Sequence, residues 1–177
     1  AGVDELIYRR IGANELGAIA VCRGSVEAQN EYASAGHDGD SAGIYAMKIV
    51  SDAGRQNGLY WPTAAGEAPS PAGEFVANAA AEGYRRNPAA YHGYRYRMLY
   101  RQSNSAAGGA RDYFKDGLLT EGYALVAWPA EYGVSGVMSF IVNQDGIVFQ
   151  RDFGADTEAR VAAMEAFDPD RNWKKVE

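Results

Sequence analysis

The stretch from Gly122 to Gly154 constrains the fold more than any other part of the chain; it reads GYALVAWPAEYGVSGVMSFIVNQDGIVFQRDFG. Three runs of strand-forming residues are separated there by turn signals, with Pro129 after the first run and the sequence NQDG, 143–146, between the last two. Gly146 can adopt the positive φ that a four-residue hairpin loop requires. The stretch therefore predicts consecutive antiparallel strands, and it contains no catalytic motif.

The residues before this stretch extend the predicted sheet. From Gly93 the side chains alternate with the period of two that is typical of a half-buried strand. One face would carry Tyr94, Tyr96, Met98 and Tyr100, and the other Arg95, Arg97, Leu99 and Arg101. With a short edge strand at 111–114 and a further strand at 118–128, we expect an antiparallel meander of about four strands over residues 93–154.

Helical periodicity dominates the start of the chain. Apolar residues at steps of three, four and seven predict a long helix over 4–34, with Asp4 as its N-cap and a kink or break near Gly12. In the loop-rich middle, 35–92, we expect short helices over 44–50 and 73–83. A closing helix over 156–167 would begin at Asp156.

These elements predict an α+β fold in a single domain, 1–177, in which the N-terminal helix packs across the antiparallel meander. Short helices would fill the middle and the C-terminus. The long helix and the meander are the two parts with the strongest local patterns, and the loop-rich middle is the part with the weakest.

Charge and apolar content exclude two classes of partner. The formal charge of -6 disfavours binding to nucleic acid, which requires a positive surface. The sequence has no apolar run of the length that a membrane span requires. Cys22 is the only cysteine, so no intrachain disulfide can form, and its helical setting favours a buried thiol.

Four long segments of the chain form specific motifs: RRIGANELGAIAVCRGSVEAQNEYA (9–33), NGLYWP (57–62), the meander through Thr157, and FDPDRNWKKV (167–176). Together they resemble the bacterial DUF2950 family. The resemblance covers nearly the whole chain. Members of this uncharacterised family are exported and often carry a further domain upstream, so the resemblance implies that this chain is the C-terminal part of a longer precursor.

A second set of residues is spread over the predicted helix and sheet: Asn14-Glu15, Ala18-Ile19, Ala28-Gln29 and Tyr32-Ala33 in the helix, and Gly122-Tyr123, Pro129, Gly136, Phe140, Val142 and Asp145-Gly146 in the sheet. These residues resemble, more weakly, the globular domains of type IV pilins and pseudopilins, in which a long N-terminal helix packs on an antiparallel sheet. The apolar membrane half-helix of a pilin is absent. The resemblance therefore implies a pilin-like layout and does not imply membrane anchoring.

The sequence gives no catalytic residue and no cofactor site. Neither His37 nor His92 stands beside a nucleophile motif. His37, Asp38 and Asp40 are weak candidates for a cation site, so we expect no metal. The alternating Asp168, Asp170 and Asn172 resemble the start of a calcium loop, but Trp173 occupies the position that requires glycine. Turn and cap chemistry explains both groups more simply.

The Tyr and Arg alternation over 91–101 has two interpretations. It is typical of surfaces that stack bases of single-stranded nucleic acid. It is equally typical of a strand whose tyrosines pack on a helix while its arginines point outward. The negative net charge favours the second interpretation.

Two functions remain open. The first is a non-enzymatic structural or interaction protein, exported to the periplasm or cell surface of a bacterium, that assembles with itself or with another exported protein. The second is a periplasmic protein that binds or hydrolyses a small molecule in an aromatic pocket between the loop around Trp61 and the sheet. That pocket would be lined by Tyr60, Trp61, Tyr94, Trp128 and Tyr132. An aromatic core and an aromatic pocket have the same composition, so the sequence cannot separate the two.

Overall fold

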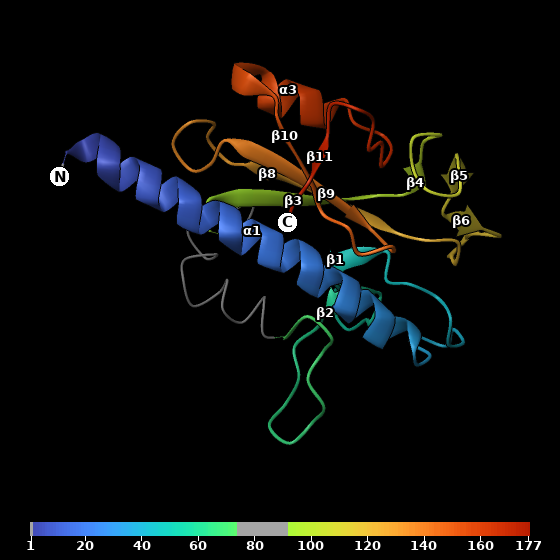
Figure 1. Cartoon of the computed structure of the whole chain (residues 1–177). Coiled ribbons are helices and arrows are strands. Elements are labelled where there is room, and N and C mark those ends of the chain that lie inside the picture. The colour runs from blue at the N-terminus through green and yellow to red at the C-terminus, as the bar shows by residue number, and fades with distance from the viewer. Residues whose placement is uncertain (1, 74–91) are drawn as a thin grey trace.

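The computed structural model describes residues 2–73 and 92–177, and Figure 1 shows a sheet between two helices. The long helix α1 (Val3–Ala33) crosses one face of the sheet, and the short helix α3 (Thr157–Ala162) lies over the other. The predicted α+β class, with a long N-terminal helix packed on an antiparallel meander, is confirmed.

The sheet has five antiparallel strands in the order β11-β10-β9-β8-β3. Their bounds are β3 Tyr94–Leu99, β8 Ala124–Pro129, β9 Met138–Asn143, β10 Phe149–Asp152 and β11 Lys174–Lys175. The predicted hairpin between β9 and β10 is present: Gly146 has a φ of 76° and its N–H donates to the carbonyl of Asn143 at 2.9 Å. The edge strand β11 was not predicted, because two residues carry no readable alternation.

Three pairs of short strands lie outside the main sheet. They are the parallel pair β1 (Lys48–Val50) with β2 (Gly58–Tyr60), and the antiparallel pairs β4 (Arg101–Gln102) with β5 (Arg111–Asp112) and β6 (Phe114–Lys115) with β7 (Leu118–Leu119). The predicted helix over 44–50 is wrong. Ile49 and Val50 are β-branched and pair as a strand with a partner that the local pattern does not reveal. The predicted helix over 73–83 lies outside the described residues except for Gly73.

Helix α1 differs from its prediction at its start and at Gly12. Gly2 occupies the N-cap position without any side-chain cap bond, and Asp4 lies in the first turn. An acidic residue there is favourable because the helix dipole leaves partial positive charge at that end. The helix is continuous from Val3 to Ala33, and Figure 1 shows it running straight, so the predicted kink or break is wrong.

Small residues let α1 approach the sheet closely. Ala18 and Cys22 are both 0% exposed, and below them lie the rings of Tyr94 and Phe140, with their centroids 5.9 Å apart. A Cβ atom on Gly136 would clash with the ring of Tyr94, so glycine is required there. The prediction that Cys22 is buried is confirmed, and burial raises the pKa of its thiol to about 12.

Polar side chains fix α1 on the sheet and on the adjoining loops. Glu15 Oε1 accepts hydrogen bonds from the backbone N–H groups of Val137 and Met138, both at 3.0 Å. Nearer the C-terminal end, the buried Gln29 donates to the carbonyl of Ala46 at 2.9 Å and accepts from the N–H of Ala46 at 2.8 Å. These two attachments fix both the position and the rotation of the helix.

The opposite face of the sheet carries the arginines of β3. Arg95 pairs with Trp128 and Arg97 with Val126 across the strands, so these side chains share a face. Arg97 donates to the carbonyls of Val161 and Met164 at 2.6 and 2.9 Å, at the C-terminal end of α3. The expectation that the arginines point outward is therefore wrong for Arg95 and Arg97, which are partly buried on the face that α3 covers, and holds for Arg101, which is exposed. The C-terminal carbonyls of α3 attract the positive charge of Arg97.

The closing helix is shorter than predicted. A 3-10 turn, η1 (Gly154–Asp156), precedes α3, and Asp156 stands at the N-cap position without a side-chain cap bond. The helix ends at Ala162, and Phe167 lies beyond it, where its N–H donates to the carbonyl of Arg101 at 2.9 Å. Because Phe167 bonds to the β4 segment, the last turn of the helix predicted over 156–167 does not form.

Replacing Ala18 with Leu should lower the free energy of unfolding by about 1–3 kcal/mol, because α1 leaves no room for the larger side chain at the sheet. Ala20 is exposed on the same helix, and Ala20→Leu is the matched control, with an expected change within about 0.5 kcal/mol. Equilibrium urea unfolding followed by circular dichroism measures both values. Equal unfolding free energies for the two variants would contradict this packing.

Candidate functional site

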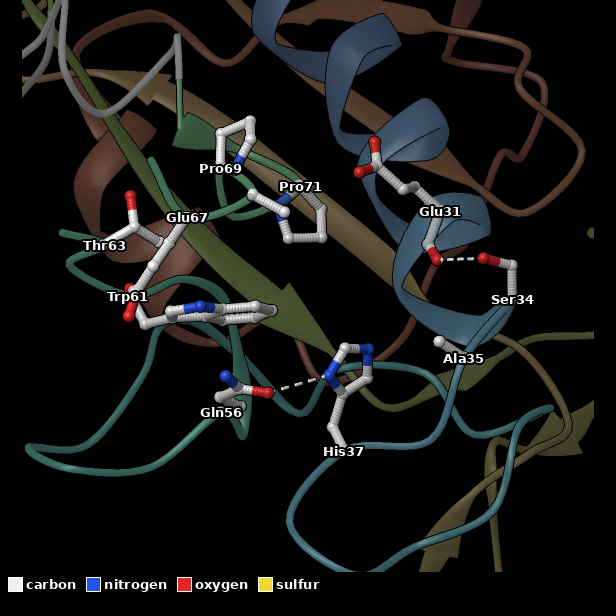
Figure 2. Close-up of a pocket in the computed structure, with 11 residues that line it drawn as sticks. Glu31, Ser34, Ala35, His37, Gln56, Trp61, Thr63, Glu67, Pro69 and Pro71 are labelled. Atoms are coloured by element: carbon white, nitrogen blue, oxygen red, sulfur yellow. Dashed lines mark hydrogen bonds between the residues drawn. The ribbon is translucent and has the colours of Figure 1, made fainter. Parts of the chain in front are cut away.

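A groove opens where the C-terminal end of α1 meets the loop that follows β2 (Figure 2). Its volume is about 460 Å³, which lies within the range of small-molecule sites. We call it the Trp61 groove. It is lined by Glu31, Ser34, Ala35, His37, Gln56, Trp61, Thr63, Glu67, Ala68, Pro69 and Pro71.

The C-terminal end of α1 supplies one wall of the Trp61 groove through Glu31, the C-cap residue Ser34 and Ala35 directly after it. The last turn of α1 contains no basic residue, so the partial negative charge of its terminal carbonyls is not neutralised by its own side chains. The hydroxyl of Ser34 donates to the carbonyl of Glu31 at 2.6 Å, which satisfies one of these carbonyls. This wall is therefore electrostatically negative.

Three aromatic rings meet beside this wall. Tyr32 and His37 stack with their centroids 4.1 Å apart and an interplanar angle of 24°. Trp61 approaches both rings at steep angles, with its centroid 5.4 Å from that of His37 and 6.3 Å from that of Tyr32. Trp61 remains partly exposed, so the indole contributes an accessible apolar surface to the groove.

Hydrogen bonds hold the imidazole of His37 in place. Its Nε2 atom lies 3.0 Å from the carbonyl of Tyr32, and since a carbonyl only accepts, Nε2 carries a hydrogen and donates. Its Nδ1 atom lies 3.2 Å from Oε1 of Gln56. Both ring nitrogens of His37 therefore face groups of the same chain.

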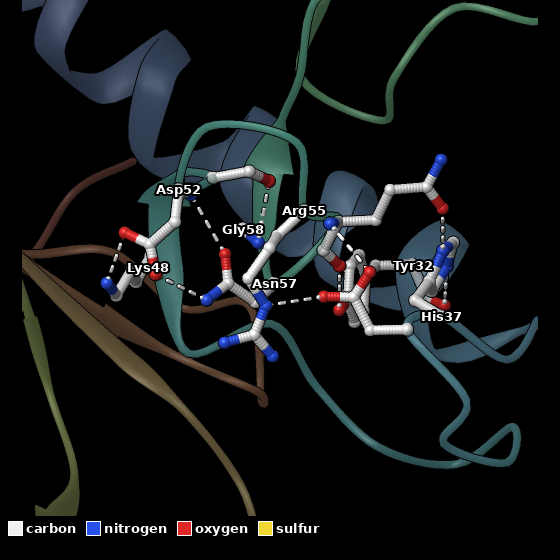
Figure 3. Close-up of polar contacts among 10 residues, drawn as sticks. Tyr32, His37, Lys48, Asp52, Arg55, Asn57 and Gly58 are labelled. Carbon is white, nitrogen blue, oxygen red and sulfur yellow. Dashed lines mark hydrogen bonds and ion pairs between the residues drawn. The ribbon is translucent and has the colours of Figure 1, made fainter.

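The segment that carries Gln56 is tied to the end of α1 (Figure 3). The hydroxyl of Tyr32 donates to the carbonyl of Gln56 at 2.5 Å, and Asp38 accepts from the N–H of Gln56 at 2.9 Å. The other carboxylate oxygen of Asp38 accepts from Nε of Arg55 at 3.1 Å. Asp38 has a φ of 51°, a conformation that aspartate tolerates better than most residues.

A second polar cluster, also visible in Figure 3, closes the turn between β1 and β2. Asp52 accepts a hydrogen bond from Lys48 at 2.6 Å and another from the side-chain amide of Asn57 at 2.8 Å. Both bonds lower the pKa of the Asp52 carboxyl, and the bond from Lys48 has the larger effect. Gly58 lies so close to the backbone of Ser51 that a Cβ atom would clash. The turn places β2, and therefore Trp61 directly after it, against α1.

The remaining wall is the loop from Trp61 to Pro71. Its two ends are fixed: Trp61 packs against a small apolar cluster, and the N–H of Ala72 donates to the carbonyl of Leu59 at 2.9 Å. Within the loop, one carboxylate oxygen of Glu67 accepts from the N–H of Ala64 at 2.9 Å. The cluster that supports this wall consists of Ala28, Tyr32, Ala46, Leu59 and Ala72.

The structure separates the five aromatic residues that the sequence suggests for one pocket. Trp61 lines the groove, and Tyr60 packs on the small cluster beneath it. Tyr94 is 0% exposed under α1. Trp128 follows Val126 on the α3 face, where its indole donates to Glu158 at 2.8 Å. Because Tyr94 pairs with Pro129 and neighbouring side chains alternate between faces, Tyr94 and Trp128 cannot line one cavity.

Tyr132 is also remote from the Trp61 groove. It lies in the turn between β8 and β9, where it forms an isolated bridge with Gly136. A hydrogen bond with Asp152, on β10, is the main cause that raises the pKa of its hydroxyl. The expected aromatic pocket between the Trp61 loop and the sheet therefore does not contain the residues proposed for it.

Two of the three weak metal candidates, His37 and Asp38, have side chains held by contacts within the chain, and Asp40 donates its backbone N–H to the carbonyl of His37 at 2.9 Å. His37 is bonded to Tyr32 and Gln56, and Asp38 to Arg55 and Gln56, as described above. The calcium-like spacing at 168–172 is turn chemistry, since Asp170 accepts from the N–H of Asn172 at 2.8 Å. Within 2–73 and 92–177, no group of three or more His, Cys, Asp or Glu side chains is arranged to hold a metal ion.

Sequence reasoning missed most of the residues that line the groove. Glu31, Gln56 and Glu67 are far apart in the sequence, and no catalytic or ligand-binding motif joins them. The available signal was the loop itself, where Pro62, Pro69 and Pro71 follow Trp61 closely. Those prolines indicate that the loop after Trp61 has a restricted conformation, but they do not indicate that the loop faces the end of α1.

Comparison with known proteins gives one match. The family model described as "Protein of unknown function (DUF2950)" matches residues 1–176. The chain belongs to the DUF2950 family. Comparison with curated proteins and with solved structures found no match. Membership of the DUF2950 family confirms the resemblance seen in the sequence and supplies no activity, so functional arguments must come from the residues of this DUF2950 chain.

Tyr32 should make the stability of this DUF2950 chain depend on alkaline pH. Burial, and then the carboxylates of Asp38 and Asp40, raise its pKa to about 12. The folded state therefore holds the proton more tightly than the unfolded chain, where tyrosine titrates near about 10. This contribution to stability is complete below about pH 10 and is lost as the pH rises through about 12.

The measurement is the free energy of unfolding in urea at several pH values between roughly 9.5 and 11.5, an interval in which the unfolded chain loses the tyrosine proton before the folded state does. Burial also raises the pKa of Tyr94, Tyr113 and Tyr123, so the wild type should lose stability steeply. Tyr32→Phe should show a shallower loss than the wild type. Tyr8→Phe, which removes an exposed hydroxyl outside the groove, is the matched control. Identical slopes for Tyr32→Phe and wild type would refute the role assigned to Tyr32.

Proposed function

We propose that this DUF2950 chain is a non-enzymatic binding protein that takes a small organic molecule in the Trp61 groove. The observation that carries the proposal is the groove itself, about 460 Å³ in volume and lined by an accessible indole, two prolines and a few polar groups. Such a mixture of apolar surface and a small number of polar groups is typical of ligand sites.

The lining residues favour binding over catalysis. His37 is the lining side chain best suited to general acid–base chemistry, and both of its ring nitrogens face groups of the same chain. The Ser34 hydroxyl donates to its own helix rather than to a base. Neither residue is therefore placed as half of a nucleophile and base pair.

The proposal includes export to the periplasm or the cell surface, which is what the resemblance to the DUF2950 family implies. Over the ranges 2–73 and 92–177, the structure has no helix with the length and apolar character that a membrane crossing needs.

A fragment screen by ¹H–¹⁵N NMR tests this proposal. Bound fragments should shift the indole N–H resonance of Trp61 and the amide resonances of residues that line the groove. Trp61→Ala should weaken binding about tenfold or more, since buried aromatic anchors dominate such contacts. Trp128→Ala, on the α3 face, is the matched control and should leave the affinity unchanged. A diverse screen that shifts no groove resonance would exclude a ligand site there.

Self-assembly is a second candidate function, and a specific observation favours it. Four large apolar residues in the first half of α1 are exposed: Val3 (74%), Leu6 (61%), Tyr8 (71%) and Leu16 (70%). Figure 1 shows this part of α1 extending beyond the edge of the sheet. Exposed apolar groups of this size are common at protein contacts, which supports assembly with further copies or with another exported protein.

Sedimentation equilibrium over a range of concentrations, together with electron microscopy, tests self-assembly. The wild type should associate as its concentration rises, and Leu16→Lys should remain monomeric because a charge would enter the contact. Leu118→Lys is the matched control, since Leu118 is an exposed leucine on β7 away from α1. A wild type that stays monomeric at high concentration and forms no fibres would exclude this function.

A further inference from the structure

We propose that the ligand of the Trp61 groove carries an alkylammonium group next to an apolar chain. This inference rests on the proposed binding function and names the chemical class that the groove selects. Three features of the groove carry it: the sign of the charges that line it, the partly exposed indole of Trp61, and the apolar walls between the charges.

The charges that line the groove are negative. Glu31 on α1 and Glu67 on the opposite loop contribute carboxylates, and among the lining residues that the structure describes there is neither lysine nor arginine. The C-terminal end of α1 adds partial negative charge on the same side as Glu31. An anionic ligand would be repelled from both walls, whereas a cation would be attracted to both.

The two glutamates are available to a ligand. The Glu31 side chain lies on an exposed turn of α1 and makes no hydrogen bond or ion pair within the described chain. Glu67 uses one carboxylate oxygen to accept from Ala64, which leaves the second oxygen for a ligand. Figure 2 shows these two side chains on different walls, with the groove between them.

Trp61 provides a second attraction for a cation. Its neighbours His37 and Tyr32 meet it at interplanar angles of 56° and 68°, so neither ring stacks on the indole face. Instead, Tyr32 stacks on His37. An ammonium group over an indole face gains about 0.5–2 kcal/mol, and tryptophan is the strongest of the aromatic residues in this role.

The walls between the charges suit methylene groups. Ala35, Ala68, Pro69 and Pro71 have no polar side-chain atoms and, together with the indole, form the apolar part of the lining. A strongly hydrated inorganic cation would gain nothing from these surfaces. An aliphatic chain that ends in an ammonium group matches both parts of the groove.

This chemistry has two sources, a free amine and the side chain of a lysine residue. The experiment therefore titrates the full chain with two cationic probes, 1,5-diaminopentane and Nα-acetyl-lysine N-methylamide. Two further probes have a similar length: 1-pentanol, which is uncharged, and glutarate, which is negatively charged. The readout is the dissociation constant from NMR shifts of the Trp61 indole N–H and the groove amides.

We expect the cationic probes to bind at least about tenfold more tightly than 1-pentanol, and glutarate not to bind. Glu31→Gln and Glu67→Gln should each weaken the cationic probe about threefold, which is the size of one exposed charge interaction. Glu27→Gln removes an exposed carboxylate from α1 outside the groove and is the matched control. Glutamine at position 67 can still accept the bond from Ala64, so the loop is preserved.

The outcomes separate the two proposals. Binding of either cationic probe with the expected effect of both glutamates supports the ligand class, and the probe that binds identifies the source. If 1-pentanol or glutarate binds as tightly as the cations, or if Glu31→Gln and Glu67→Gln behave like Glu27→Gln, the ligand class is wrong while the binding function stands. If fragments of every charge fail to shift the groove, both proposals are wrong.

Discussion

The close contact between α1 and the sheet determines where the rest of the structure lies. Ala18 and Cys22 bring the helix down onto the rings of Tyr94 and Phe140, which larger side chains would prevent. Glu15 then satisfies two N–H groups at the start of β9. Helix α1 is thereby fixed in distance and rotation over one face of the sheet, and α3 covers the other face. The carbonyls at the C-terminal end of α3 accept hydrogen bonds from Arg97.

The Trp61 groove depends on the same helix. Gln29 binds both backbone groups of Ala46, so the segment leading to β1 is fixed directly to α1. One turn later, Tyr32 packs on the small cluster beneath Trp61, stacks on His37 and donates to the carbonyl of Gln56. The helix therefore both forms one wall of the groove and positions the two loops that form the others.

Sequence patterns predicted the parts of this fold that are governed by local chemistry. The hairpin at Gly146 follows from a turn that requires positive φ, and α1 follows from the spacing of its apolar residues. Where a distant partner decides the conformation, the same reasoning failed. The segment around Ile49 became a strand because β2 pairs with it, and the residues after Ala162 left the helix because Phe167 pairs beside β4. Tyr94 and Trp128 were grouped as one aromatic pocket, although strand alternation places them on opposite faces.

The sequence by itself determined the α+β class, the membership of the DUF2950 family and the presence of Trp61 in a proline-rich loop. These depend on neighbouring residues and on long motifs, both of which are visible along the chain. Tertiary structure alone decided that Glu31, Gln56 and Glu67 meet around that tryptophan. Their meeting requires α1 to be docked and two loops to be tied to it, and long-range contacts of this kind have no signature in the spacing of a single sequence.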